Sequence, residues 1–129
     1  ITVGDDVKVI LMEAKEDHPF VQVELMMPIL PLVRVPDVDQ AIEMAVRVEH
    51  GNRHTAMMHS RNVEKLTKMA KLIQTTIFVK NGPSYAGIGV GGEGYTTFTI
   101  AGPTGEGLTS AKSFARRRRC VLVGGMDVR

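Results

Sequence analysis

Two amphipathic segments, separated by a short apolar stretch, constrain the fold of this chain more than any other feature. In the first segment Asp37 and Gln40 have the spacing of a helix N-terminus, and Gly51 supplies a stop. Its apolar residues recur at helical intervals, at Val38, Ala41, Ile42, Ala45 and Val48. Ser60 or Asn62 caps the second helix. Its predicted buried stripe consists of Val63, Leu66, Met69, Ala70 and Ile73.

Short apolar strands alternate with these helices. Strands are predicted at residues 29–35, 55–59 and 76–80. Strand, helix, strand, helix, strand at such short intervals is the pattern of two successive crossover units, which share one parallel sheet with helices on its faces. The predicted fold class is therefore α/β, with a parallel-sheet βαβαβ unit in a single domain that spans residues 1–129.

The flanking regions are less regular. Residues 7–12 are typical of a strand, and residues 20–24 of a second extended stretch. Residues 81–107 hold most of the thirteen glycines and contain one plausible strand, residues 96–100. A long Gly-rich loop of this kind usually has a function or covers something. The remainder is assigned a final helix (residues 108–117) and a final strand (residues 120–123).

Composition limits the class of function. The net charge of +2 is too small to indicate nucleic acid, and no apolar run approaches the roughly 18 residues of a membrane span. One cysteine excludes an internal disulfide framework and favours a reducing compartment, so we expect a cytoplasmic protein. The chain starts at Ile1 rather than at methionine, which is consistent with processing or with a fragment.

Three tempting ligand motifs have simpler interpretations. Residues 87–92 satisfy G-x-G-x-x-G, but no helix that could hold a pyrophosphate starts after them. Residues 102–107 look like a phosphate loop, but no lysine follows their glycines. His50 and His54 are four apart, yet Gly51 and Asn52 at the helix end should prevent them from sharing a helical face as zinc ligands would. No metal site is predicted.

Residues 24–35, followed by residues 37–42, resemble the aldehyde dehydrogenase segment E-x-F-G-P-V-x-P-V and the strand and helix after it. The resemblance implies that Glu24 hydrogen-bonds the ribose at the nicotinamide end of NAD. It also implies that Met26, in place of the family's phenylalanine, lies against the nicotinamide. Met27 replaces the family's glycine, so the local packing should differ from the family pattern.

Three further segments, residues 50–56, 74–81 and 99–110, are similar to the CoA-acylating aldehyde dehydrogenases of ethanolamine and propanediol utilisation. In that branch a cysteine thiolate attacks the aldehyde, the adduct gives a hydride to NAD, and CoA takes the acyl group. The nucleophile is expected before Ile1, so this chain is interpreted as a C-terminal fragment that is inactive alone. The resemblance implies a homo-oligomer, with a cytoplasmic or bacterial microcompartment location and contact with the microcompartment shell.

His54 and Cys120 are the remaining candidates for chemistry. His54 lies where a helix ends and a strand begins, and its imidazole suits proton transfer near neutral pH, although a core or capping role is the alternative. Cys120 opens an apolar run and is predicted to be buried and structural. The four arginines before it, residues 116–119, either complement a helix dipole or contact a subunit or CoA phosphates. A competing function is a small non-enzymatic α/β binding module that uses the Gly-rich loop and these arginines.

Overall fold

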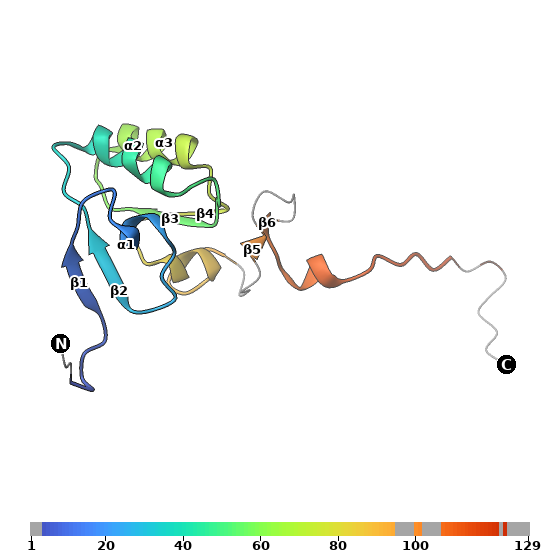
Figure 1. Ribbon diagram of the computed structural model, residues 1–129. Helices are drawn as coiled ribbons and strands as arrows, with labels where there is room; N and C mark the ends of the chain where they lie inside the picture. The colour runs from blue at the N-terminus through green and yellow to red at the C-terminus, as the bar shows by residue number, and fades with distance from the viewer. Residues whose placement is uncertain (1–3, 95–99, 102–106, 122, 124–129) are drawn as a thin grey trace.

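The computed structural model describes residues 4–94, 100–101, 107–121 and 123, and strands alternate with helices from β1 to the first 3-10 helix (Figure 1). In chain order the elements are β1 (Ile10–Glu13), α1 (Pro19–Gln22), β2 (Ile29–Leu32), α2 (Val38–Val48), β3 (Thr55–Met58), α3 (Val63–Ile73), β4 (Ile77–Lys80), the 3-10 helix η1 (Ser84–Ile88), β5 (Ile100–Ala101), β6 (Gly107–Leu108) and the 3-10 helix η2 (Ala111–Phe114). The α/β class is confirmed.

The two long helices begin where the sequence predicts. Asp37 Oδ1 accepts a hydrogen bond from the Gln40 N–H at 2.9 Å, and Asn62 Oδ1 accepts one from the Lys65 N–H at 3.0 Å. Each bond satisfies a backbone donor that has no partner within its own helix. α3 ends at Gln74, whose φ of 51° is left-handed and stops the helical ladder.

The parallel direction of the strands is confirmed, but the single sheet is not. β1 pairs with β2 and β3 with β4, both parallel, whereas β5 and β6 are antiparallel, so the described strands form three two-stranded sheets. β2 already has β1 as its neighbour, and Pro31 brings no N–H that a second neighbour could use. The βαβαβ prediction therefore holds for β3–α3–β4 alone.

The core lies between the paired helices and the β3–β4 sheet. Ile42, Met69 and Ile73 are 2%, 6% and 4% exposed, and Ala56, Met58 and Phe78 of the two strands pack against them. The stripe predicted for α3 is confirmed at Leu66, Met69 and Ile73, while Ala70 is half-buried and Val63 is exposed. Val63 is the first residue of the helix, one turn before Leu66, the first buried residue of the stripe.

The extended stretch predicted at residues 20–24 is wrong for residues 20–22, because residues 19–22 form α1, whereas Val23 after it is extended. His18 Nδ1 accepts a hydrogen bond from the Phe20 N–H at 3.1 Å, and Pro19 occupies the first helical position, which its fixed φ favours. The final helix is also wrong: β6 and the four-residue η2 occupy residues 107–114. Within the predicted strand at residues 120–123, the described residues 120, 121 and 123 are not in a strand.

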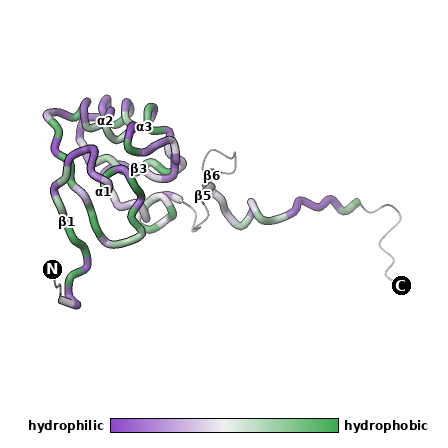
Figure 2. The backbone as a smooth tube through the Cα atoms, in the orientation of Figure 1, coloured by the Kyte–Doolittle hydropathy of each residue, from purple (hydrophilic) through white to green (hydrophobic). Residues whose placement is uncertain are grey.

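The C-terminal segment runs away from the α/β body as an extended chain (Figure 1). Its strongly hydrophilic stretch in Figure 2 corresponds to the four arginines. The strand predicted at residues 96–100 falls mostly outside the described residues, and residues 100–101 form β5. Within the described ranges no helix has the length and apolar character needed to cross a bilayer.

Candidate cofactor site

A cleft of about 250 Å³ lies between the end of α1 and the end of α2. Its walls come from residues 21–24, which finish α1 and lead into β2, and from the segment that joins α2 to β3. The lining residues are Val21, Gln22, Val23, Glu24, Val48, Glu49, His50, Asn52 and His54. Glu24 and His54, which the sequence suggests on separate grounds, therefore face one cleft.

Glu49 folds the wall that carries His54. Its carbonyl accepts hydrogen bonds from the Asn52 backbone N–H at 3.2 Å and from Asn52 Nδ2 at 2.9 Å, and its carboxylate accepts one from the Arg53 N–H. These contacts hold His50 and Arg53 in the left-handed region, each with φ 55°. The loop is consequently fixed by the carbonyl and the carboxylate of Glu49 and by the Asn52 side chain rather than by a regular element.

The backbone of His54 is anchored to the sheet, although its ring is exposed. The Thr76 N–H donates to the Arg53 carbonyl at 2.8 Å, and the Ile77 N–H donates to the His54 carbonyl at 3.1 Å. Among the described residues, neither the His54 ring nor the Glu24 carboxylate has a hydrogen bond or ion pair, and both residues are exposed. Both groups are therefore accessible to a ligand in the cleft.

An ion pair beside the cleft links the segment before α1 to the last turn of α2. Arg47 Nε and Nη2, in the last turn of α2, donate to Glu16 Oε1 and Oε2 at 2.9 and 3.1 Å, just before α1. The Arg47 hydrogen bond lowers the pKa of Glu16, and Glu16 in turn raises the pKa of Arg47. A two-point contact of this kind is directional, so it joins the segment before α1 to the end of α2 in a defined orientation.

Other predicted site residues lie elsewhere. Met26 is 89% exposed and does not line the cleft. His50 and His54 do share the cleft, but no group of three or more potential metal ligands occurs within the described ranges. Sequence reasoning missed Glu49 and Asn52. The polar residues on both sides of Gly51, in a helix-to-strand connection, are the signal that could have pointed to them.

The glycines of residues 87–92 serve packing. A Cβ on Gly87 would overlap the Ile77 side chain, and one on Gly92 would lie 2.8 Å from the Ala86 carbonyl oxygen. The motif therefore lets η1 approach β4 closely, and no helix follows its glycines among residues 89–94. Residues 102–106, which include most of the second Gly-rich motif, lie outside the described residues.

The prediction that Cys120 is buried is wrong for this chain. Cys120 is exposed, and Val121 beside it is 71% exposed, because no described strand lies next to this segment. Residues 116–119 are exposed too, and none of these arginines has an ion pair with another described residue. The only helix just before them is η2, whose four residues provide little dipole to complement.

Comparison with known proteins identifies the class. Residues 8–107 match the model of the aldehyde dehydrogenase family, so the chain belongs to that family. It is 63% identical over 115 residues to propanal dehydrogenase (CoA-propanoylating) of Citrobacter freundii, covering 89% of this chain and 25% of the relative. It is 56% identical over 128 residues to acetaldehyde dehydrogenase (acetylating) of Escherichia coli K12, covering 99% and 27%.

Solved structures agree with these matches. The propionaldehyde dehydrogenase of Rhodopseudomonas palustris, with bound CoA and an acylated cysteine, is 74% identical with a TM-score of 0.85. An engineered glycolyl-CoA reductase with bound NADP+ is also 74% identical, with a TM-score of 0.84. Each match includes the whole of this chain but only 29% of the solved structure. The resemblance to CoA-acylating aldehyde dehydrogenases is confirmed, and the chain spans about a quarter of the length of its curated relatives.

Proposed function

We propose that the full-length protein containing this chain is a CoA-acylating aldehyde dehydrogenase, which converts a short aliphatic aldehyde, CoA and NAD to acyl-CoA, NADH and a proton. The observation that carries this proposal is the cleft that brings Glu24 and His54 together in a chain of this family. The nicotinamide ring supplies the hydride acceptor when the cofactor is bound. The nucleophilic cysteine is assigned to another part of the full-length protein, because Cys120 does not line the cleft.

Glu24 fits the ribose of the cofactor. Its carboxylate is exposed at the cleft and has no partner among the described residues, so both oxygens can accept hydrogen bonds from neighbouring hydroxyl groups. Hydrogen bonds to an ionised acceptor are short and directional. Glu24 would therefore orient the cofactor, and misplacement of the reacting ring by a fraction of an ångström slows transfer strongly.

His54 is suited to hold or move a proton at the same cleft. Its backbone is fixed by β4 while its ring remains free, so the imidazole has a defined origin and an accessible nitrogen. We infer that neutral His54 accepts a proton from a reacting thiol or hydroxyl group. Met26 is retained as a second cofactor contact, since an exposed thioether beside Glu24 can lie against an aromatic ring.

The Glu24 assignment is tested by Glu24→Gln in the full-length protein. Hydride transfer, followed as NADH formation in a single turnover, should fall roughly tenfold to a hundredfold while CoA binding persists. Glu64→Gln is the matched control, because Glu64 is an exposed carboxylate on α3, outside the cleft. An unchanged transfer rate together with unchanged NAD affinity would remove Glu24 from the site.

The His54 assignment is tested by the pH–rate profile of His54→Ala. The neutral-pH limb of the profile should disappear, and the acyl-transfer and hydride-transfer steps should respond separately in single-turnover assays. His59→Ala is the control, because His59 is exposed just after the other end of β3. If both half-reactions and the profile match those of the unmodified enzyme, His54 has no part in proton transfer.

The interpretation of this chain as a fragment that is inactive alone has its own test. The purified 129-residue chain should form no acyl-CoA from aldehyde, NAD and CoA, because only cofactor-positioning and proton-transfer groups can be assigned to it. Measurable NAD-dependent product would contradict both the reading of the chain as an inactive piece and the exclusion of Cys120 as nucleophile.

We also propose that the full-length protein is a homo-oligomer that acts in the cytoplasm or inside a bacterial microcompartment. The support is a 54% identical structure, a propionaldehyde dehydrogenase from the fucose utilisation microcompartment of Clostridium phytofermentans, with a TM-score of 0.84. Native mass spectrometry of the full-length protein, and its recovery with purified shells, test the two parts separately.

A further inference from the structure

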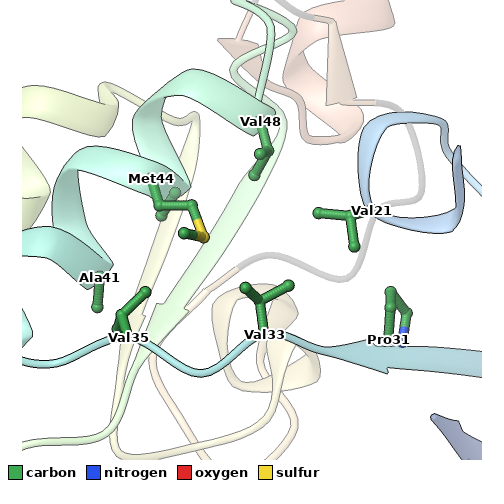
Figure 3. Close-up of a pocket in the computed structure, with 8 residues that line it drawn as sticks. Val21, Pro31, Val33, Val35, Ala41, Met44 and Val48 are labelled. Atoms are coloured by element: carbon green, nitrogen blue, oxygen red, sulfur yellow. The ribbon is translucent and has the colours of Figure 1, made fainter. Parts of the chain in front are cut away.

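An apolar hollow of about 310 Å³ adjoins the cofactor cleft, with which it shares Val21 and Val48 (Figure 3). Met44 and Val48 point into it from α2, Val33 and Val35 from the segment that follows β2, and Val21 from α1. Every residue that lines the hollow is aliphatic, a proline or a methionine. No charged or hydrogen-bonding side chain is therefore present to hold a polar ligand or ordered water there.

The hollow is too large for the short aldehyde of the proposed reaction. A dry cavity of about 150 Å³ accepts a group the size of benzene, so this hollow takes about two such groups. A two- or three-carbon aldehyde would cover only part of this open hollow, and the rest of its apolar lining would stay in contact with water, which is unfavourable. Its size and chemistry fit two large apolar side chains.

The surroundings show the same incomplete burial. On the adjoining strands Leu11, Leu30 and Leu32 are 59%, 51% and 47% exposed, although strands of a parallel sheet are usually covered on both faces. The structures at 74% identity are more than three times the length covered by this chain, since it covers 29% of each. Covering material of apolar character is thus to be expected on the same polypeptide, where it acts at an effective concentration of about millimolar or more.

We propose that this hollow is filled in the full-length protein by large apolar side chains from the region of the polypeptide that lies outside the 129 residues. This inference rests on the existence of the proposed full-length protein and not on its activity. Val21 and Val48 line both the hollow and the cleft, so the same side chains hold the two walls that carry Glu24 and His54. Contacts in the hollow would thus let the rest of the enzyme position Glu24 and His54.

Thiol accessibility in the full-length protein tests the proposal. Ala41→Cys and Val33→Cys place a thiol in opposite walls of the hollow, and Glu43→Cys is the matched control on the exposed face of α2. With each rate referenced to the same cysteine in denatured protein, the two hollow thiols should be modified at least about a hundredfold more slowly, and the control less than about tenfold. Peptide mass spectrometry separates each site from the other cysteines, and two hollow variants guard against one that does not fold.

Four results would overturn the proposal. The hollow thiols could react as fast as Glu43→Cys, which would show an open surface. Protection could appear only on addition of aldehyde, or be lost on dilution as the oligomer dissociates, which would make the occupant a substrate or a second copy. Finally, a photo-crosslinking residue at position 33 should attach to a peptide outside these 129 residues, and attachment to residues 100–129 would contradict it. None of these readouts requires activity, so failure of the proposed function is scored separately.

Discussion

The two parallel strand pairs have the same length and direction but very different environments. β3–β4 carries a buried alternation at Ile77 and Val79, whereas β1–β2 has no buried residue. The connection explains the difference. β3 and β4 are joined by α3, whose eleven residues cover a face of the pair and pack against α2, whereas β1 and β2 are joined by a loop with the four-residue α1.

The end of each pair differs as well. Asn81 closes the β3–β4 pair, since its side chain accepts from the Ser60 N–H at 2.7 Å and donates to the Ser60 carbonyl at 2.9 Å. The ion pair between Glu13 and Arg34, beside β1–β2, is exposed on both sides and contributes little in water. The β3–β4 unit (residues 37–81) is thus stabilised from within, while the β1–β2 unit (residues 10–32) depends on covering from elsewhere.

The largest expected effect comes from emptying the core of the β3–β4 unit. Ile42→Ala should lower the free energy of unfolding by about 2–5 kcal/mol, because Ile42 is 2% exposed and its loss leaves a cavity. Leu11→Ala in β1, which is 59% exposed, should cost about 1 kcal/mol or less in the same chain. Urea unfolding of the 129-residue chain measures both. Equal losses would show that the two units are equally buried and break the comparison.

A somewhat smaller effect is expected where η1 meets β4. Gly87→Ala should destabilise the chain by about 1–3 kcal/mol, because the added methyl overlaps the Ile77 side chain in a packed region. Gly82→Ala is the control, since its nearest contact would be an ordinary 3.4 Å to a Val79 methyl group. If the two variants unfold at the same urea concentration, the glycines of this motif are not needed for packing.

Local signals were sufficient to predict the β3–β4 unit. The caps at Asp37 and Asn62 and the spacing of Leu66, Met69 and Ile73 are all determined within one or two helical turns, and the structure confirms them. α1 was missed because four residues carry no periodicity, and its start depends on a side-chain contact from His18. The prediction of a single sheet is wrong because the pairing of distant strands depends on which other strands compete for each sheet edge. A local sequence pattern does not contain that information.

The candidate site shows the same division. Glu24 and His54 could be named from motif wording, but their shared cleft depends on the loop geometry imposed by Glu49 and on the ion pair between Glu16 and Arg47. The spacing of residues in the sequence predicts neither the Glu49 contacts nor the ion pair. Cys120 shows the converse case, because the apolar run after it predicts burial but the described residues provide nothing to cover it.

Removal of a helix cap gives a smaller effect that sharpens the comparison. Asn62→Ala should destabilise the β3–β4 unit by about 1 kcal/mol, because the Lys65 N–H loses its acceptor. Asn62→Asp should retain most of the stability, since a carboxylate also caps a helix. Hydrogen exchange at Lys65, compared with exchange in β1, shows whether the loss stays within the unit. A loss of protection spread equally over both units would mean that they unfold together at this level.

The smallest expected effect is the loss of stability as the pH falls. It distinguishes the Asp39 contacts within the β3–β4 unit from the Glu16–Arg47 contact between the two units. Hydrogen bonds from Lys65 and Lys68 of α3 lower the pKa of Asp39 from 3.8 to about 2, and the Arg47 hydrogen bond lowers that of Glu16 from 4.5. Because both values are depressed on folding, each pair contributes fully above the ordinary value of its carboxyl group. The Asp39 contribution is lost as the pH falls from about 4 through about 2.

Asp39→Asn should therefore flatten the fall of the unfolding midpoint between about pH 4 and pH 2, whereas Glu16→Gln should begin to flatten it nearer pH 4.5. The side chains of both pairs are partly exposed to water, so the changes should be modest and should shrink with added salt. Glu64→Gln is the control, as Glu64 has no ion pair with another described residue. If Asp39→Asn keeps the slope of the unmodified chain in this range, the lysines of α3 do not stabilise α2 through Asp39, and burial of Ile42 and its neighbours alone accounts for the pairing of the two helices.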